Sequence, residues 1–99
     1  MRVVVQYRRG QVPAEHAEAN ERALWAWVER LRTHPEHEQT IAFGGGRTVS
    51  SSDSAEYDGD VFGISVLRVS HAAAAMELLG DWPEVPYGGR ADVLTELPR

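Results

Sequence analysis

His16 is the side chain of this sequence best suited to act as a general base. It lies near the start of a segment with helical spacing, "PAEHAEANERALWAWVERLRTH". On a helical wheel it aligns with Asn20, Ala23 and Trp27, along the edge of the apolar stripe. An imidazole at a core boundary near a helix N-terminus tends to stay neutral and can accept a proton. The alternative is a boundary histidine that only packs on Trp27.

A glycine-rich stretch, "AFGGGRTVSSSDSAEYDGD", supplies the acids that can orient His16. It does not match a phosphate-binding loop, which needs a lysine after its glycines and a helix behind it. Its acids do not keep the register of a calcium loop. The pattern favours a long connection between strands that bends at the glycines and turns at Asp58-Gly59. That length permits a flap over a pocket, in which Asp58 or Asp60 would pair with His16.

Four further side chains are candidates for substrate binding. Arg47 carries a planar guanidinium that suits a ligand carboxylate, although a solvated surface arginine is the alternative. Tyr7, Trp27 and Tyr57 offer aromatic surface for a pocket wall, although Tyr7 also fits a strand end with its hydroxyl in water.

The segment "HPEHE" is the only cluster that suggests a metal, and it fits one poorly. His34 and His37 form a His-x-x-His pair, which differs from the helical i, i+4 zinc pair, and no third ligand stands out. We expect a solvated turn here and no metal site. The absence of cysteine excludes disulfides and thiolate ligands.

The length and charge of the chain limit the kinds of function and partner that we expect for it. The chain has 99 residues, which predicts one domain spanning residues 1–99. Its net charge is −5 and its basic residues, all arginine, are spread along the chain, so we expect no nucleic-acid partner. No segment reaches the length of a membrane span, and the N-terminal apolar run is too short for a signal peptide. These features predict a cytoplasmic protein without a membrane partner.

Hydrophobic periodicity predicts six elements, with Ser70 capping the second helix and Gly80 ending it. They are a strand over 3–7, a helix over 13–34, strands over 40–43 and 60–69, a helix over 71–79 and a strand over 90–97. In the third strand, alternation predicts two apolar faces: Phe62, Ile64 and Val66 on one, Val61, Leu67 and Val69 on the other.

The order βαββαβ predicts an α+β, ferredoxin-like fold with an antiparallel four-stranded sheet. Two helices cover one face of such a sheet. Because the third strand is apolar on both sides, the other face needs a partner. We therefore expect a homodimer, with Trp25 and Trp82 as candidate contacts.

The chain resembles the YCII-related proteins of the dimeric α/β-barrel superfamily, especially the DGPF branch. The resemblance is carried by a first strand ending in Tyr7, the "PAEHAEANERALWAWVERL" helix, "GDVFGISVLRVSHAAAAMEL" and "DWPEVPYGGRADVLTELP". Two features depart from the pattern: the Asp-Gly-Pro-Phe signature is absent, and alanines replace the acids that follow the capping serine.

The resemblance implies a dimeric α/β barrel with a small-molecule pocket and no bound cofactor. It also implies a lyase, isomerase or related proton-transfer activity, with His16 as the base and Asp58 or Asp60 orienting it. The alternative function is a non-catalytic ligand-binding or accessory module.

Overall fold

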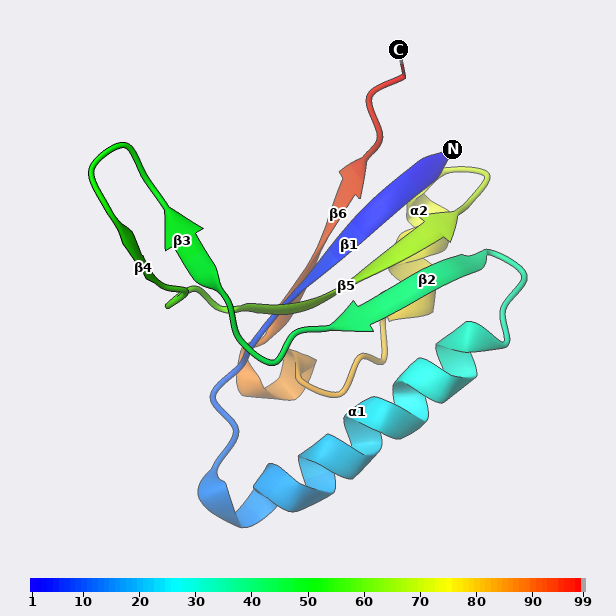
Figure 1. The fold of residues 1–99 in the computed structure, drawn as a ribbon. Helices are drawn as coiled ribbons and strands as arrows, with labels where there is room; N and C mark the ends of the chain where they lie inside the picture. Colours follow the sequence, from blue (N-terminus) through cyan, green and yellow to red (C-terminus); the bar gives the residue numbers. More distant parts are fainter. Residues whose placement is uncertain (99) are drawn as a thin grey trace.

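The computed structural model describes residues 1–98 and is built around a four-stranded antiparallel sheet (Figure 1). Its strands, in spatial order, are β2 (His37–Ala42), β5 (Val61–Arg68), β1 (Arg2–Arg8) and β6 (Arg90–Thr95). All neighbouring strands run antiparallel. A helix follows β1 and another follows β5, so the predicted α+β, ferredoxin-like arrangement is confirmed.

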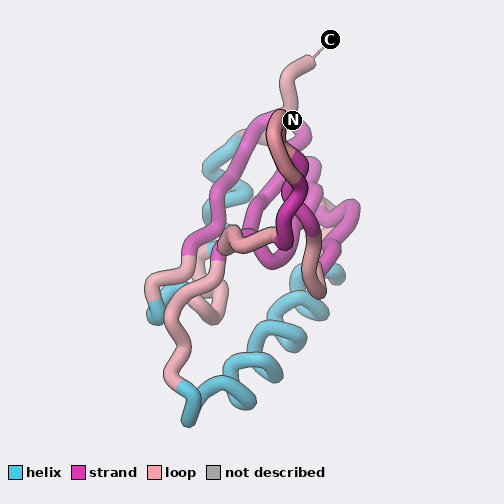
Figure 2. Tube along the Cα trace, turned by 60° about the vertical axis from the view of Figure 1, so that its left-hand side comes forward, coloured by secondary structure: helices cyan, strands magenta, loops and turns pink. Residues whose placement is uncertain are grey.

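Both helices contribute side chains to one core on the same face of the sheet. Figure 2 distinguishes the helices from the strands by colour. The helices are α1 (Ala17–Arg32) and α2 (Ala72–Leu79), accompanied by the 3-10 turns η1 (Ala14–His16) and η2 (Val85–Tyr87). The predicted first helix thus opens with a 3-10 turn. The core between the layers contains β1, β5 and helix side chains: Val3, Val5, Tyr7, Leu67, Trp27, Leu31, Ala75 and Leu79.

The opposite face of the sheet, called the open face below, carries Val4, Ile64, Val66 and Leu94. Val4 is paired across the strands with both Val66 and Leu94, so these side chains form one apolar patch. The first three are only half-buried in the single chain, and Leu94 is exposed. At one edge of this face Glu38 accepts hydrogen bonds from Arg2 at 3.1 Å and from Arg68 at 3.0 Å.

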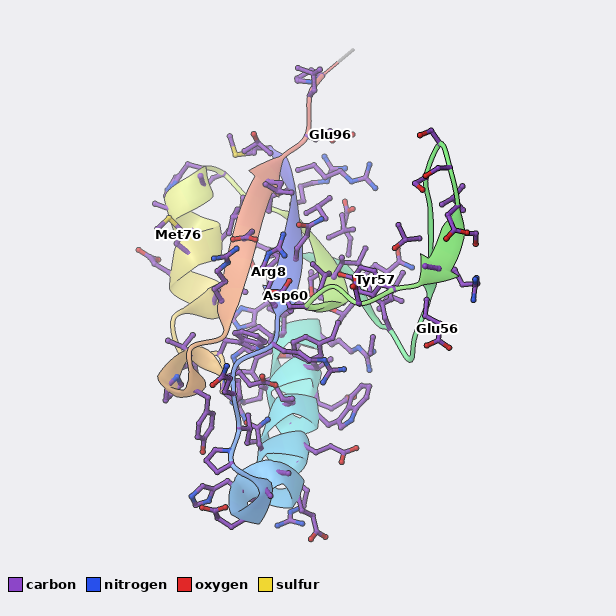
Figure 3. All side chains as sticks on the ribbon, turned by 90° about the vertical axis from the view of Figure 1, so that its left-hand side faces the viewer. Arg8, Glu56, Tyr57, Asp60, Met76 and Glu96 are labelled. Atoms are coloured by element: carbon purple, nitrogen blue, oxygen red, sulfur yellow. The ribbon has the colours of Figure 1, made fainter. Side chains whose placement is uncertain are left out.

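The glycine-rich connection folds as a second, two-stranded sheet, which the sequence did not predict. Strands β3 (Arg47–Val49) and β4 (Ser54–Glu56) pair as a hairpin that stands apart from the main sheet (Figures 1 and 3). The hairpin turn is closed by the Ser50 amide, which donates to the Asp53 carbonyl at 2.8 Å. Each of these strands has three residues, all exposed and mostly polar, so no hydrophobic pattern marks them in the sequence.

A β-bulge overturns the predicted faces of β5 at its first residues. Tyr7 is paired with Gly63 and Arg8 with Val61, so Phe62 is the extra residue of the bulge. Phe62 therefore reaches the helix side, where its ring lies 5.9 Å from that of Trp82, and does not share a face with Ile64. Val61 pairs with Arg8 and lies on the open face, which reverses its predicted side.

Two smaller predictions were wrong. Strand β2 begins at His37, so this histidine belongs to the sheet and not to a solvated turn. The cap of α2 is His71, whose Nδ1 accepts a hydrogen bond from the Ala74 amide at 3.3 Å, where Ser70 was expected. An imidazole nitrogen here satisfies a helix N–H that the serine hydroxyl was expected to satisfy.

Within residues 1–98, no helix combines the length and the apolar character that crossing a membrane requires.

Candidate functional site

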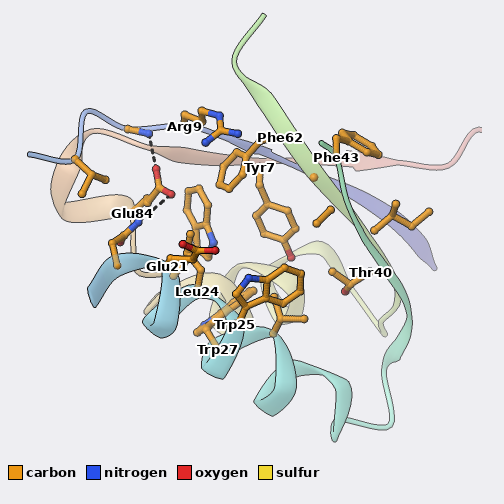
Figure 4. A pocket seen from close by; sticks show the side chains of 18 of the residues that line it. Tyr7, Arg9, Glu21, Leu24, Trp25, Trp27, Thr40, Phe43, Phe62 and Glu84 are labelled. Atoms are coloured by element: carbon orange, nitrogen blue, oxygen red, sulfur yellow. Dashed lines mark hydrogen bonds between the residues drawn. The ribbon is translucent and has the colours of Figure 1, made fainter. Parts of the chain in front are cut away.

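A cavity of about 620 Å³ lies between α1 and the helix-facing side of the sheet (Figure 4). Its walls come from the end of β1, from α1, from β2, from the β5 bulge and from the connection that follows α2. Six aromatic side chains form part of the lining: Tyr7, Trp25, Trp27, Phe43, Phe62 and Trp82. A mostly apolar hollow with a few polar groups is the usual form of a small-molecule site.

The aromatic wall is held by ring contacts around Tyr7. The Trp27 ring meets Tyr7 edge-on with centroids 5.9 Å apart, and Trp82 lies 5.3 Å away on a tilted plane. The indole nitrogen of Trp27 donates to Asp81 at 2.9 Å, which fixes its ring. Trp25 is 47% exposed, so its ring borders the cavity and remains open to solvent.

Glu84 closes one end of the cavity, as the dashed bonds in Figure 4 show. Its carboxylate accepts from the Gly10 amide at 2.8 Å and from the Asn20 side chain at 3.3 Å, and the residue is buried. These bonds tie the segment after β1 to α1 and to the late connection. A side chain at Gly89 would approach within 2.9 Å of the Glu84 Cβ, so glycine permits this packing.

Four polar side chains form a continuous hydrogen-bonded chain from the cavity wall to β2. The Tyr7 hydroxyl lies 2.7 Å from Ser65 Oγ, and Ser65 Oγ lies 2.7 Å from Thr40 Oγ1. Thr40 Oγ1 lies 2.8 Å from Nε2 of His37. Tyr7 and Thr40 line the cavity, Ser65 is fully buried and His37 is half-buried. We call this chain the hydroxyl relay.

The two titratable ends of the hydroxyl relay are both shifted toward their neutral forms. Burial raises the pKa of Tyr7 to about 12, partly offset by its hydrogen bond with Ser65. Burial lowers the pKa of His37 as well, and the positive charge of Arg32 lowers it further. A neutral imidazole has one nitrogen free to accept a proton.

The predicted binding residues divide between two hollows. Tyr7 and Trp27 lie in the wall of the cavity. Arg47 and Tyr57 line a second hollow of about 600 Å³, beside the hairpin. There Arg47 donates to the Ser54 carbonyl at 3.2 Å, and the Tyr57 hydroxyl accepts from the Val61 amide at 3.0 Å. The binding roles of all four remain predictions.

The structure does not bring His16 together with Asp58 or Asp60. His16 is exposed at the end of η1, outside the cavity lining, and its ring lies 6.4 Å from that of Tyr87. Asp60 is paired with Arg8 at 2.5 Å, and the two are labelled side by side in Figure 3. Asp58 is exposed. The proposed pairing therefore has no support from contacts within one chain.

Sequence reasoning missed Ser65, Thr40, His37 and Glu84 as parts of the site. A serine inside the apolar run "VFGISVLRV", on the side that faces the helices, was the one available signal. Its partners lie 58 and 25 residues away along the chain, so no local pattern joins them. Within residues 1–98, no three His, Asp or Glu side chains gather as metal ligands.

A search of solved structures places this geometry among known folds. The chain is similar to 5-chloro-2-hydroxyhydroquinone dehydrochlorinase (TftG) from Burkholderia phenoliruptrix AC1100, solved in complex with 2,5-dihydroxybenzoquinone. The TM-score is 0.59, and the match covers 100% of this chain and 96% of the TftG chain. Sequence identity is 14%. The two proteins share a fold.

No protein-family model and no curated protein sequence matches the chain.

Proposed function

We propose that this protein binds a small planar aromatic molecule in the cavity between α1 and the sheet. The observation that carries the proposal is the aromatic lining, in which Trp25 and Phe62 border a hollow large enough for a single ring system. Flat rings bind well between aromatic side chains because stacked or edge-on contacts add to the burial of apolar area. The fold shared with TftG, which was solved with a quinone, supports this ligand class.

The charged groups at the cavity favour a ligand with polar substituents. Arg9 lines the cavity and its guanidinium carbon lies 4.6 Å above the centre of the Phe62 ring. Arg32 lines it from the end of α1, while Glu21 and Glu84 supply carboxylates. A ligand with an aromatic ring and hydroxyl or keto groups could pack against the aromatic side chains and form hydrogen bonds with these charged groups.

Calorimetric titration with 2,5-dihydroxybenzoquinone and with 4-nitrophenol tests the proposal. We expect saturable binding, and we expect Trp25→Ala to weaken it about tenfold by removing an aromatic wall, a loss of about 1.4 kcal/mol. Met76→Ala is the matched control, because Met76 is exposed on α2 away from the cavity and should bind as the parent does. Failure of both compounds to bind would reject the proposed function.

A homodimer formed through the open face is the second part of the proposal. Val4, Ile64 and Val66 form an apolar patch, and Arg2, Glu38 and Arg68 supply a charged edge beside it. An apolar centre with a polar rim is the usual composition of an interface between two copies. The resemblance to YCII-related proteins supports the same pairing.

A catalytic role for His16 remains a separate proposal. In this proposal His16 accepts a proton and Asp58 or Asp60 orients it within a lyase or isomerase. It is supported by the resemblance, and it requires the η1 turn or the hairpin of a second copy to change position. A His16→Ala variant that turns over an identified substrate at the parent rate would remove His16 from the mechanism. The competing function is ligand binding without turnover.

A further inference from the structure

The hydroxyl relay joins the cavity to a titratable imidazole on an outer strand. Tyr7 belongs to β1, Ser65 to β5, and Thr40 and His37 to β2, so the chain runs across three strands. Its bonds are 2.7, 2.7 and 2.8 Å long, which is the range of well-made hydrogen bonds. Two of its members face the cavity, and its last member is half-exposed to solvent.

Packing alone does not require hydroxyl groups at these positions. Phenylalanine, alanine and valine would fill nearly the same space as Tyr7, Ser65 and Thr40. Replacing both partners of a buried hydrogen bond by apolar groups of similar shape is close to neutral for stability. Three hydroxyls in a row nevertheless connect β1, β5 and the outer strand β2, and together they make an uninterrupted hydrogen-bonded path.

We propose that the hydroxyl relay carries a proton from an acidic phenol or enol in the cavity to His37, which serves as the terminal base. This inference rests on the proposed ligand-binding function and names the ligand's reacting group. His37 acts through the other members, and Tyr7 is the group that touches the ligand.

Each of the four side chains accepts one proton in the step, so that no proton is lost or gained overall. The ligand O–H bond breaks as its proton forms a bond to the Tyr7 oxygen, and the original Tyr7 proton moves to Ser65. Ser65 passes its proton to Thr40, and Thr40 passes its proton to Nε2 of His37. Every hydroxyl regains a proton, and the products are a ligand anion and an imidazolium. Burial raises the pKa of Tyr7 to about 12, which disfavours a free tyrosinate, and the step as written forms none.

The reverse orientation of the hydroxyl relay is equally well bonded. With Nε2 of His37 protonated, each hydroxyl turns round, and Tyr7 then donates its proton into the cavity. The protonation state of His37 therefore sets whether Tyr7 accepts from a ligand or donates to it. This gives one device for removing and returning a proton, as an isomerase or lyase requires.

Charged groups from α1, β1, β5 and the connection before β2 surround His37. Arg32 on α1 opposes protonation of His37. In the connection before β2, His34 lies 3.9 Å from Glu36, whose backbone carbonyl accepts from the Arg68 amide of β5. Glu38, next to His37, is neutralised by Arg2 and Arg68. Arg9 and Arg32 at the cavity favour the ligand anion that the step produces.

An NMR titration of the His37 imidazole with and without 4-nitrophenol tests the inference. A bound phenol that shares its proton should raise the pKa of His37 by about one unit, a tenfold change in proton affinity. The matched ligand 4-nitroanisole has no acidic proton and should leave the pKa of His37 unchanged. Thr40→Val and Tyr7→Phe should each abolish most of the rise, because each breaks the relay.

Two variants with the same chemistry control for the substitutions. Thr48→Val in the exposed hairpin and Tyr87→Phe in η2 lie outside the cavity lining and should keep the full rise. A rise retained in Thr40→Val or in Tyr7→Phe, or the same rise with 4-nitroanisole, would overturn the relay. Tryptophan indole signals monitor binding in the same samples. Indole shifts without a His37 response would reject the relay alone, and no indole shifts with either 4-nitrophenol or 2,5-dihydroxybenzoquinone would reject the proposed function itself.

Discussion

The Tyr7 hydroxyl and the Ser65 hydroxyl lie 2.7 Å apart in the buried centre of the sheet, although 58 residues separate them in the chain. Their strands are paired so that Val5 faces Ser65 and Tyr7 faces Gly63. The Tyr7 ring therefore extends over the glycine and brings its hydroxyl back to the neighbouring serine. This contact joins the aromatic wall of the cavity to the polar side chains of β2.

Replacing Ser65 by alanine should destabilise the fold, because the Tyr7 hydroxyl would lose its hydrogen-bond partner. Ser65→Ala leaves the buried Tyr7 hydroxyl without its partner, which costs about 1–3 kcal/mol. In Tyr7→Phe/Ser65→Ala that hydroxyl is gone, so the double variant should be no less stable than Ser65→Ala alone. Urea unfolding of the parent, both single variants and the double variant measures the coupling. Strictly additive losses would show that the two hydroxyls do not interact.

The stability of the protein should depend on pH through His37. Because the pKa of His37 is lowered in the fold from its ordinary 6.5, the unfolded chain binds its proton more tightly. The contribution of neutral His37 to the free energy of unfolding is fully present above pH 6.5. It is lost as the pH falls through the lower pKa of the folded state. We expect the free energy of unfolding to fall on acidification below about pH 6.5. His37→Gln should make this fall shallower, and a fall that is unchanged by this substitution would contradict the role given to His37.

The carboxylate of Glu84 should be needed to hold the end of the cavity. Glu84→Gln replaces one acceptor oxygen by an N–H group that faces a donor, either the Gly10 amide or Asn20. We expect a loss of about 1–3 kcal/mol in the free energy of unfolding. Glu21 also lines the cavity but is exposed, so Glu21→Gln should change stability by about 0.5 kcal/mol or less. Equal stability of the two variants would contradict the role given to Glu84.

Self-association should depend on the open face. Val66 is paired with Val4 at its centre, so Val66→Asp would bury a charge in the interface of a dimer. Sedimentation velocity should show a dimer for the parent and a monomer for this variant. Met76→Asp places the same charge on the exposed side of α2 and should remain dimeric. A monomeric parent would end the proposal of a dimer.

The order of strands and helices could be predicted from the sequence because it rests on local periodicity. The burial of Trp27 and Leu31 on α1 follows directly from helical spacing. The position of Phe62 could not be predicted, because a bulge depends on how β5 pairs with β1 and leaves no local signature.

The candidate site was harder to predict than the fold. Tyr7 and Trp27 were found because large aromatic residues at a strand end and on a helix flank suggest a pocket wall. Thr40 and Ser65 were missed because they belong to the site through a hydrogen bond between two strands, which no local sequence pattern indicates. His37 looked like part of a turn, and only its pairing with Leu67 shows that it belongs to the sheet.

Binding of a planar aromatic molecule in the cavity should be seen in the NMR signals of the tryptophan indoles. The chain has three tryptophans, and Trp25, Trp27 and Trp82 all line the cavity. In a two-dimensional NMR titration with 2,5-dihydroxybenzoquinone, we expect the indole signals to shift together and to saturate. Two results would contradict such binding. In the first, the indole signals stay in place while signals of residues in the hollow of Arg47 and Tyr57 move; in the second, no signal moves.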